Sequence, residues 1–546
     1  MSLNLPNWAQ ELKEHYESNA SNQFVLYGNV GDKIMLPNSE GKLGTITDFI
    51  GNTLMSKFDV VVEYDVGSGL QIVRDMSGYF KDWPSFKETG SVVREKRPQF
   101  IIPLLNKFFL YCHNLGITRG KKPSIGLIIK EADLVIPYIQ SGFSQDINSM
   151  ALQVKYWSTE SSFFNQPLAV VLLTENIHAL HHQIQSNVRS VKIEVSFPSE
   201  EQIKEALDSL KVKCPISLSE EIDSSRLVGV KISSIESLVL RKEHRKEKIT
   251  TNDLYEIRKK LVEQDSNGLI EFISSKSTLD DLYGEEKLKE TLRLDMKLLE
   301  SGDTDIIPMG YGLFGPVGTG KSFFVLCLAG EANIPVVKLK NFRDKYVGES
   351  ESNLEKIFRL LRALGRCIVF IDEADQTLGK RNSNDESGVS GRLYSMMAEE
   401  MSNPLNRGRI VWILASSRPD LIEVDFKRPG RIDVKVPLFP TSSSEQSFDL
   451  LHKICTKKGI VIEESYKEKL IPILPLMMTP GEVNNIAVKV QRKLRTAKEE
   501  KNSFEVLEEI FQNYTPPVSL DTIKYQIDLA IKESSDMDFV PKVFLT

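Results

Sequence analysis

The most constraining feature of the sequence is a glycine-rich segment, 315–322, between an apolar run and a helical stretch. It fits the pattern G-x-x-x-x-G-K-[ST] and reads Gly315-Pro316-Val317-Gly318-Thr319-Gly320-Lys321-Ser322. A strand that ends in such a turn directs backbone N–H groups inward, and the helix that follows adds the partial positive charge of its N-terminus. The segment therefore predicts an α/β fold in which this loop binds phosphate.

Lys321 and Ser322 end this loop, where the helical stretch Phe323–Asn333 begins. In loops of this type the lysine reaches the β and γ phosphates of a nucleotide, and the hydroxyl of the last residue ligates Mg²⁺. We therefore expect residues 315–322, together with Phe323 at the start of the helix, to bind the nucleotide.

A second apolar run, 367–371, ends in two acids, Asp372 and Glu373. It is predicted to be a buried parallel strand that delivers the acids to its carboxyl end. Asp372 is then placed to hold Mg²⁺ through water, and Glu373 can polarise the water that attacks the γ phosphate. Asp372 follows Lys321 by 51 residues (372 − 321), with one predicted strand between them. Together the two motifs predict a single site that binds ATP and Mg²⁺ and hydrolyses ATP.

A third segment, 425–433, carries two arginines around a Pro-Gly pair. With the two phosphate motifs, it resembles the second region of homology of the AAA ATPases. The resemblance gives Arg428 and Arg431 the role of reaching into the site of a neighbouring subunit, where an arginine stabilises charge on the transferring phosphoryl oxygens. It implies a P-loop NTPase parallel sheet with a helical lid, and a homo-oligomeric ring that is expected to be a hexamer.

Ser417 departs from the family pattern. It follows the predicted strand 410–415, where the family usually has an asparagine that orients the attacking water. A serine hydroxyl is shorter, so we expect either slow hydrolysis or a contribution from Ser416. The lid segment 479–482, with Gly481, stands where the family packs a small-residue turn near the adenine. It has no arginine, which is normal for the protein-remodelling branch of the family.

The opposite wall of the predicted pocket is the segment 281–284. Asp281, Tyr283 and Gly284 in this segment resemble the residues whose backbone contacts adenine in the family. The resemblance therefore adds these three residues to the expected nucleotide site.

The triplet Tyr346-Val347-Gly348 lies in a predicted loop between a strand, 336–339, and a helix, 352–364. In the AAA family such a loop lines the central channel and grips an extended polypeptide with little regard for its sequence. The resemblance thus predicts a protein substrate, remodelled, unfolded or disassembled through the channel. The polar stretch 380–391 is predicted to be a second channel loop.

Two alternatives remain open at this point. Basic residues close to the first channel loop permit a nucleic-acid motor or loader, although this alternative is less favoured; they are Lys338, Lys340, Arg343 and Lys345. The serine at 417 permits a nucleotide-gated scaffold with slow turnover.

The first half of the sequence parallels the second at a constant offset of 242 residues (372 − 130). The matching blocks are 127–133 with 369–375, 172–175 with 413–417, and Phe197-Pro198 with Phe439-Pro440. This agreement predicts a second AAA-like α/β module with its own helical lid.

The chemistry of the active module is missing from this copy. Lys130 falls where the second half has Asp372, and its charge would repel Mg²⁺. In the turn near 27–33 the phosphate-loop pattern is lost, and Ile34 replaces the hydroxyl residue. We therefore expect no ATP hydrolysis in the first half, which serves assembly or client binding.

The chain has 546 residues, enough for several folding units. We predict a degenerate AAA-like domain, a linker, a large AAA α/β subdomain, and a lid with a C-terminal tail; the bounds are 1–263, 264–277, 278–441 and 442–546. The five cysteines are far apart and predict isolated thiols. A net charge of −6 argues against a protein whose whole surface binds nucleic-acid phosphates. No secretory signal and no long uncharged apolar tract predict a cytoplasmic protein that is not in a membrane. The sequence His-Glu-x-x-His is absent, which excludes a fused zinc protease of the type found in some relatives.

Overall fold

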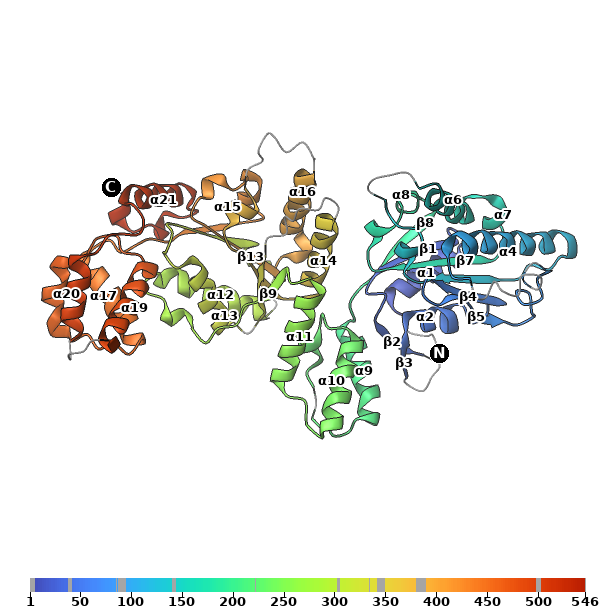
Figure 1. The fold of residues 1–546 in the computed structure, drawn as a ribbon, viewed down its shortest axis with the longest axis horizontal. Coiled ribbons are helices and arrows are strands. Elements are labelled where there is room, and N and C mark those ends of the chain that lie inside the picture. Colours follow the sequence, from blue (N-terminus) through green and yellow to red (C-terminus); the bar gives the residue numbers. More distant parts are fainter. Residues whose placement is uncertain are drawn as a thin grey trace. The chain divides into compact units, whose positions relative to one another are not determined.

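The computed structural model describes residues 5–37, 42–84, 86, 95–139, 144–220, 222–301, 305–332, 334–340, 349–379, 389–496 and 502–545. The chain divides into two compact units, Met1–Arg258 and Lys259–Thr546 (Figure 1).

The second unit is built on a six-stranded sheet of order β14-β10-β13-β12-β11-β9. Its strands are β9 (Ile270–Phe272), β10 (Gly310–Phe314), β11 (Val336–Leu339), β12 (Cys367–Ile371), β13 (Ile410–Ser416) and β14 (Val434–Pro437). All neighbours pair in parallel except β9, which runs antiparallel to β11 at the edge. Because β10, β12 and β13 are buried along their whole length, they consist of near-continuous apolar runs.

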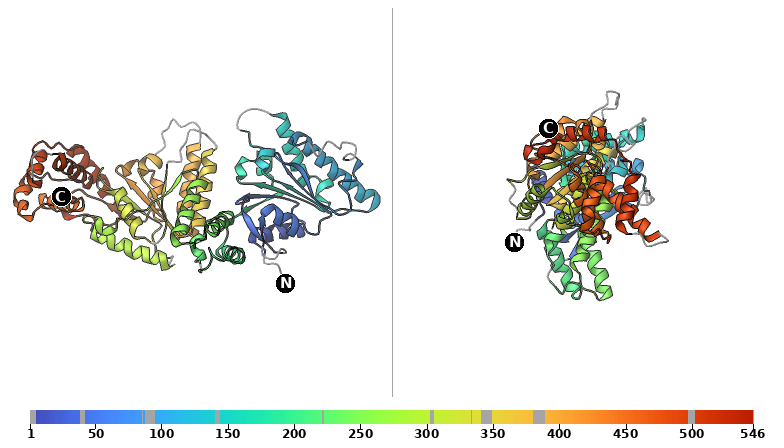
Figure 2. Two further views of the ribbon diagram at one scale, coloured as in Figure 1. Left: turned by 60° about the horizontal axis from the view of Figure 1, so that its bottom comes forward. Right: turned by 90° about the vertical axis from the view of Figure 1, so that its left-hand side faces the viewer.

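Helices cover both faces of this sheet (Figures 1 and 2). One face packs against α12 (Glu286–Ser301) and α13 (Lys321–Glu331), whose buried side chains form one core with the strands. The other face carries α14 (Glu349–Leu364) and α16 (Val389–Ser402), which pack on each other. A short helix, α15 (Ala374–Thr377), follows β12 directly. The predicted P-loop sheet is confirmed.

A separate helical cluster follows β14 and forms the predicted lid. It contains α17 (Ser444–Lys457), α18 (Lys467–Leu470), α19 (Pro480–Thr496) and α20 (Ser503–Gln512), which share one apolar core. The last helix, α21 (Leu520–Glu533), instead packs against β14 and the 3₁₀ turn Pro419–Leu421. The C-terminal part of the predicted lid therefore returns to the large subdomain.

The first unit has a sheet of order β5-β4-β6-β7-β1-β8 and a separate hairpin of β2 and β3. The strands are β1 (Gln23–Gly28), β2 (Lys33–Leu36), β3 (Lys42–Thr45), β4 (Val60–Asp65), β5 (Gly69–Asp75), β6 (Ile125–Ile129), β7 (Leu168–Thr174) and β8 (Ser190–Val195). The helices are α1 (Asn7–Glu17), α2 (Ile46–Phe49), α4 (Pro98–Arg119), α5 (Ala132–Val135), α6 (Gln145–Thr159), α7 (Ser161–Phe164), α8 (His182–Gln185), α9 (Glu200–Lys213) and α10 (Ile232–Arg245). Helix α11 (Thr251–Asp265) begins in the first unit and ends in the second. One face of the sheet packs against α4 and α6, and the other against α1 and α2.

The constant sequence offset of 242 corresponds to a repeated structure. β6 matches β12, β7 matches β13, and α5 begins 242 residues before α15, all at this offset. Isolated bridges join Pro137 to Leu180 and Gly379 to Ile422, which again lie 242 residues apart. Both sheets also carry one antiparallel edge strand. The first half is therefore a second α/β module of the same architecture, as predicted.

Three features differ from the simplest sequence-based picture. In the first unit a hairpin, β2–β3, follows the turn after β1 where the second unit begins a helix. The predicted linker, 264–277, contains β9, which extends the second sheet. Helix α4 is long and apolar enough to meet the length and composition criteria of a membrane span, with a mean hydropathy of 1.2, but six of its residues lie in the core of the first unit.

Candidate functional site

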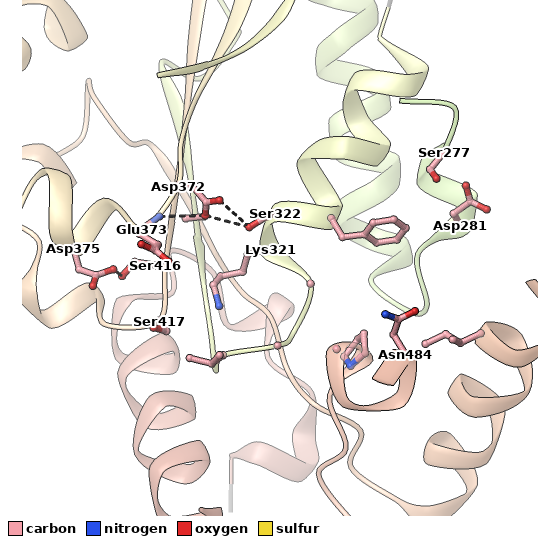
Figure 3. Close-up of a pocket in the computed structure, with 18 of the residues that line it drawn as sticks. Ser277, Asp281, Lys321, Ser322, Asp372, Glu373, Asp375, Ser416, Ser417 and Asn484 are labelled. Carbon is pink, nitrogen blue, oxygen red and sulfur yellow. Dashed lines mark hydrogen bonds between the residues drawn. The ribbon is translucent and has the colours of Figure 1, made fainter. Parts of the chain in front are cut away.

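A cavity of about 980 Å³ opens at the carboxyl end of β10, β12 and β13 in the second unit. Residues from the glycine-rich loop, the two acidic motifs and the lid line it (Figure 3). Figure 3 shows Asp372, Glu373 and Ser417 on one side of the loop, and Ser277, Asp281 and Asn484 on the other. The cavity therefore lies at the switch point where parallel α/β sheets place ligands.

The glycine-rich loop connects β10 to α13 and packs directly on the lid. Gly318 has a φ of +88°, in the left-handed region that favours glycine, and a Cβ at this position would lie 2.7 Å from the hydroxyl of Thr479. The backbone N–H of Gly481 donates to the carbonyl of Gly318 at 3.0 Å. The loop and the lid turn thus share a backbone contact that side chains would prevent.

The ammonium of Lys321 points into the loop. It donates to the carbonyls of Gly315 and Pro316, both at 2.8 Å. Burial lowers the pKa of Lys321 to about 8, against the opposing effect of the negative charges of Asp372 and Asp375. A cation held at this cost is poised to gain free energy when an anion arrives.

Ser322 and Asp372 converge at the edge of the cavity. The Ser322 hydroxyl donates to both carboxylate oxygens of Asp372 at 3.1 Å, and the Lys338 ammonium lies 2.9 Å from Oδ2 (Figure 3). A hydroxyl beside a carboxylate is the oxygen-only donor set that Mg²⁺ prefers, completed in such sites by water and phosphate oxygens. The residues present therefore fit the predicted ion.

Glu373 lines the cavity next to Asp372. Its φ is +48°, a left-handed conformation that a non-glycine residue adopts at a cost of roughly 1–2 kcal/mol. Glu131, at the matching position in the first unit, has a φ of +46°. The strained turn is therefore part of the repeated architecture.

Ser416 and Ser417 have different surroundings. The buried hydroxyl of Ser416 donates to Asp375 and accepts from the backbone N–H of Arg418 at 2.9 Å. Thr174 and Asp133 make the same bond in the first unit at the offset of 242. The Ser416 hydroxyl is thus engaged in a structural contact, which leaves Ser417 as the serine lining the cavity whose hydroxyl could face an attacking water.

Only some of the residues predicted to contact adenine are among the described residues that line the cavity. Asp281 and Gly481 line the cavity, and Asp281 pairs with Lys457 of the lid at 2.9 Å. Tyr283 packs against the lid core, and neither Tyr283 nor Gly284 is among the described lining residues. Lid residues that the sequence did not single out, including Asn484, complete this wall.

Arg428 and Arg431 are not among the described residues that line the cavity of their own chain. Both pair with Asp425, Arg428 at 2.9 Å and Arg431 at 2.5 Å. The Arg428 side chain is 68% exposed, whereas that of Arg431 is 17% exposed. An arginine that serves a neighbouring subunit must project from its own, and Arg428 meets this condition. The predicted channel-loop residues, Tyr346, Val347 and Gly348, lie outside the described part of the chain, as do 380–388 of the second predicted loop.

Gln526 of α21 contacts the glycine-rich loop, which the sequence did not predict. Its side-chain oxygen accepts from the backbone N–H of Val317 in the glycine-rich loop at 3.1 Å. Gln526 is buried although it follows Val317 by 209 residues. Such a separation leaves no local sequence signal, and only the packing of α21 brings the two together.

In the first unit, charged side chains occupy the places that correspond to the metal and phosphate sites of the second unit. Lys130 lies 3.0 Å from Asp65 and 3.4 Å from Glu63. In the turn after β1, the buried carboxylate of Asp32 accepts from the backbone N–H groups of Ile232 and Ser233 at the start of α10, at 3.0 and 2.9 Å. A carboxylate of the chain thus occupies a helix N-terminus that could otherwise receive an anion.

Comparisons with known proteins match both units. Residues 311–439 match the model of the ATPase family associated with various cellular activities (AAA), and residues 2–196 match that of the AAA+ chaperone N-terminal Rossmann-like domain. Similar relatives include the peroxisomal ATPase PEX6 of Dictyostelium discoideum, at 31% identity over 33% of this chain. Others are a cell division cycle protein 48 homolog of Archaeoglobus fulgidus, at 28% over 35%, and the ATP-dependent zinc metalloprotease FtsH 2 of Alkaliphilus metalliredigens, at 29% over 42%.

The chain covers only 15%, 29% and 34% of the lengths of these three relatives. The similarity is therefore one of domains rather than of whole proteins. Each matched range lies in one of the two units, and each of these units contains a six-stranded sheet. The chain thus carries an AAA ATPase domain in its second half and an AAA+ chaperone N-terminal Rossmann-like domain in its first.

Proposed function

We propose that this protein is an ATP-hydrolysing ring motor that remodels, unfolds or disassembles protein substrates. The observation that carries the proposal is the convergence of Lys321, Ser322, Asp372 and Glu373 on one cavity between the sheet and the lid. Each of these side chains has a partner or a position suited to one step of phosphoryl transfer.

Binding begins with the loop and its lysine. Lys321 exchanges its two loop carbonyls for phosphate oxygens, and the backbone N–H groups of 315–322 complete the cradle. Ser322 and Asp372 would hold Mg²⁺, which supplies charge neutralisation at the phosphates when it is bound. The lid closes the cavity from the side of Gly481 and Asn484.

Hydrolysis requires a base and a water. Glu373 takes the proton of the attacking water, and Ser417 helps to orient that water. A serine in this role makes turnover slow. Arg428, with Arg431 behind it, enters the cavity of the next subunit and stabilises the transferring phosphoryl group. The motor is therefore a homo-oligomer, which we propose to be a hexamer.

The proposed substrate is a polypeptide, gripped by Tyr346, Val347 and Gly348 at the channel. The alternative of a nucleic-acid motor rested on nearby basic residues. Two of these are neutralised within the unit, since Lys338 pairs with Asp372 and Lys340 with Glu271 at 3.1 Å. Ion-paired lysines contribute less to phosphate binding, so the polypeptide alternative is favoured.

The first unit is proposed to be catalytically inactive and to serve assembly or client binding. Lys130 replaces the metal-binding carboxylate, and Asp65 and Glu63 hold it in place. We also propose a cytoplasmic location.

The deciding experiment uses Glu373→Gln. We expect ATP to bind as before while the hydrolysis rate falls by on the order of 10²–10³-fold, since the base is lost. ATP-locked rings of this variant should retain a gripped protein, and added Tyr346→Ala should release it. The ATPase rate of the unmodified chain should rise with an unfolded protein and stay constant with DNA or RNA. A parental rate for Glu373→Gln would refute the proposed base, and stimulation by nucleic acid alone would refute the polypeptide substrate.

A further inference from the structure

The charges beside the metal-binding carboxylate recur in the first unit with their signs exchanged. The strand pair β11–β12 places Lys338 opposite Phe370, and β4–β6 places Glu63 opposite Ile128. Because Phe370 and Ile128 are separated by the repeat offset of 242, Lys338 and Glu63 occupy the same place in the two sheets. The corresponding positions are Lys338 and Glu63, Lys340 and Asp65, and Asp372 and Lys130.

In each unit these positions form an ion pair across the two strands. Lys338 lies 2.9 Å from Asp372, and Lys130 lies 3.4 Å from Glu63 and 3.0 Å from Asp65. Both units therefore have an ion pair between these two strands, but the strand that carries the positive charge differs between the units. In the first unit the cation, Lys130, stands at the position that corresponds to the proposed metal ligand Asp372. In the second the cation, Lys338, stands one strand away and contacts the carboxylate that the metal would use.

Lys338 is well placed to compete for that carboxylate. Its ammonium also lies 5.7 Å from the centre of the Phe370 ring, a second contact that fixes its direction. The Lys338 side chain is 37% exposed and that of Asp372 is 22% exposed, so water screens the pair only in part. A positive charge at this distance favours the free carboxylate and opposes the approach of a divalent cation to it.

We propose that Lys338 is a positioning residue that holds Asp372 beside Ser322 and lowers the affinity of the site for Mg²⁺. Magnesium must displace the ammonium from Asp372 or share the carboxylate with it. Lys338 thereby makes ATP use by this subunit respond to the concentration of free Mg²⁺. This inference deepens the proposed function and rests on it, because it concerns the same site.

The test replaces Lys338 by methionine, which keeps most of the length of the side chain and removes its charge. The full chain carries Glu373→Gln so that the nucleotide is not consumed. A fluorescent ATP analogue reports binding while Mg²⁺ is titrated from a chelated start. We expect Lys338→Met to tighten the apparent Mg²⁺ dissociation constant by about three- to tenfold, the effect of removing one partly screened charge. Affinity for the analogue without Mg²⁺ should change by less.

The matched control is Lys340→Met, which removes the same charge from the same chain segment. Lys340 pairs with Glu271 and not with Asp372, so its loss should leave the Mg²⁺ constant within about twofold. Lys338→Gln serves as a second variant, and thermal unfolding checks that each variant is folded. An unchanged or weaker Mg²⁺ constant for folded Lys338→Met and Lys338→Gln would overturn the inference. If the parent bound no magnesium nucleotide at all, the proposed function would fail instead.

Discussion

Lys321 is the residue at which the cost of burial and the chemistry of phosphate binding oppose each other. Its ammonium donates to two carbonyls of its own loop, and burial lowers its pKa to about 8. Gly318 and Gly320 already have positive φ in the chain without a nucleotide, so the loop has its left-handed backbone conformation before phosphate binds. We therefore expect phosphate binding to stabilise the charged form of the lysine more than it changes the shape of the loop.

We expect nucleotide binding to take up a proton at high pH. Bound phosphates favour the ammonium form and raise the pKa of Lys321 above about 8. At pH 7 the lysine is already protonated and binding takes up few protons. At pH 9 it is mostly neutral, so binding should take up close to one proton and be about tenfold weaker, since one pKa unit corresponds to a factor of ten. Calorimetry in two buffers of different ionisation enthalpy measures this. Lys321→Arg, which stays charged, should show no uptake, and the absence of uptake by the parent at pH 9 would contradict the assignment.

At the scale of elements, α21 connects parts of the site that are far apart in the sequence. Gln526 accepts from the glycine-rich loop, and the ring of Tyr525 lies 5.5 Å from the Arg418 guanidinium, which pairs with Asp420. At its C-terminal end, Glu533 pairs with Lys427, the residue before the proposed arginine finger. The helix thus contacts both the phosphate loop and the arginine segment.

We expect Gln526→Leu to weaken nucleotide binding. The change keeps the size of the side chain but leaves the N–H of Val317 without its acceptor, which costs about 1 kcal/mol and corresponds to roughly fivefold in affinity. Fluorescence titration with a nucleotide analogue measures the effect, with thermal unfolding alongside. Lys524→Gln, an exposed change on the same helix, should bind as the parent does. Equal affinities for Gln526→Leu and Lys524→Gln would show that α21 does not support the loop.

The contacts of α21 illustrate which parts of the site can be predicted from the sequence and which cannot. The glycine-rich loop and the acids after β12 are local patterns, and the offset of 242 showed the second module because sheet and turn are repeated together. The contacts of Gln526 and Lys338 depend on helix packing and strand register between distant segments. The hairpin after β1 was missed because short apolar runs leave helix and strand undecided.

At the scale of the whole molecule, the proposed site is complete only when two chains meet. Arg428 projects from its own unit and is not among the described residues that line its own cavity, whereas Glu373 lines it. In the proposed mechanism the catalytic groups are divided between a subunit that binds ATP and a neighbour that supplies the arginine. Defects in the two groups should complement each other within a mixed ring.

We expect Arg428→Ala to bind ATP normally and to hydrolyse it on the order of 10³-fold more slowly, as for loss of an arginine finger. Glu373→Gln should be similarly inactive. In rings co-assembled from equal amounts of the two, an active site needs the cavity of Arg428→Ala and the arginine of Glu373→Gln, so about one quarter of sites should recover activity. Steady-state ATPase assays on co-expressed, purified rings measure this recovery. Mixing after separate assembly, without subunit exchange, is the control and should recover none. If co-assembled rings stayed inactive, each subunit would have to use its own arginine, and the site would not be shared.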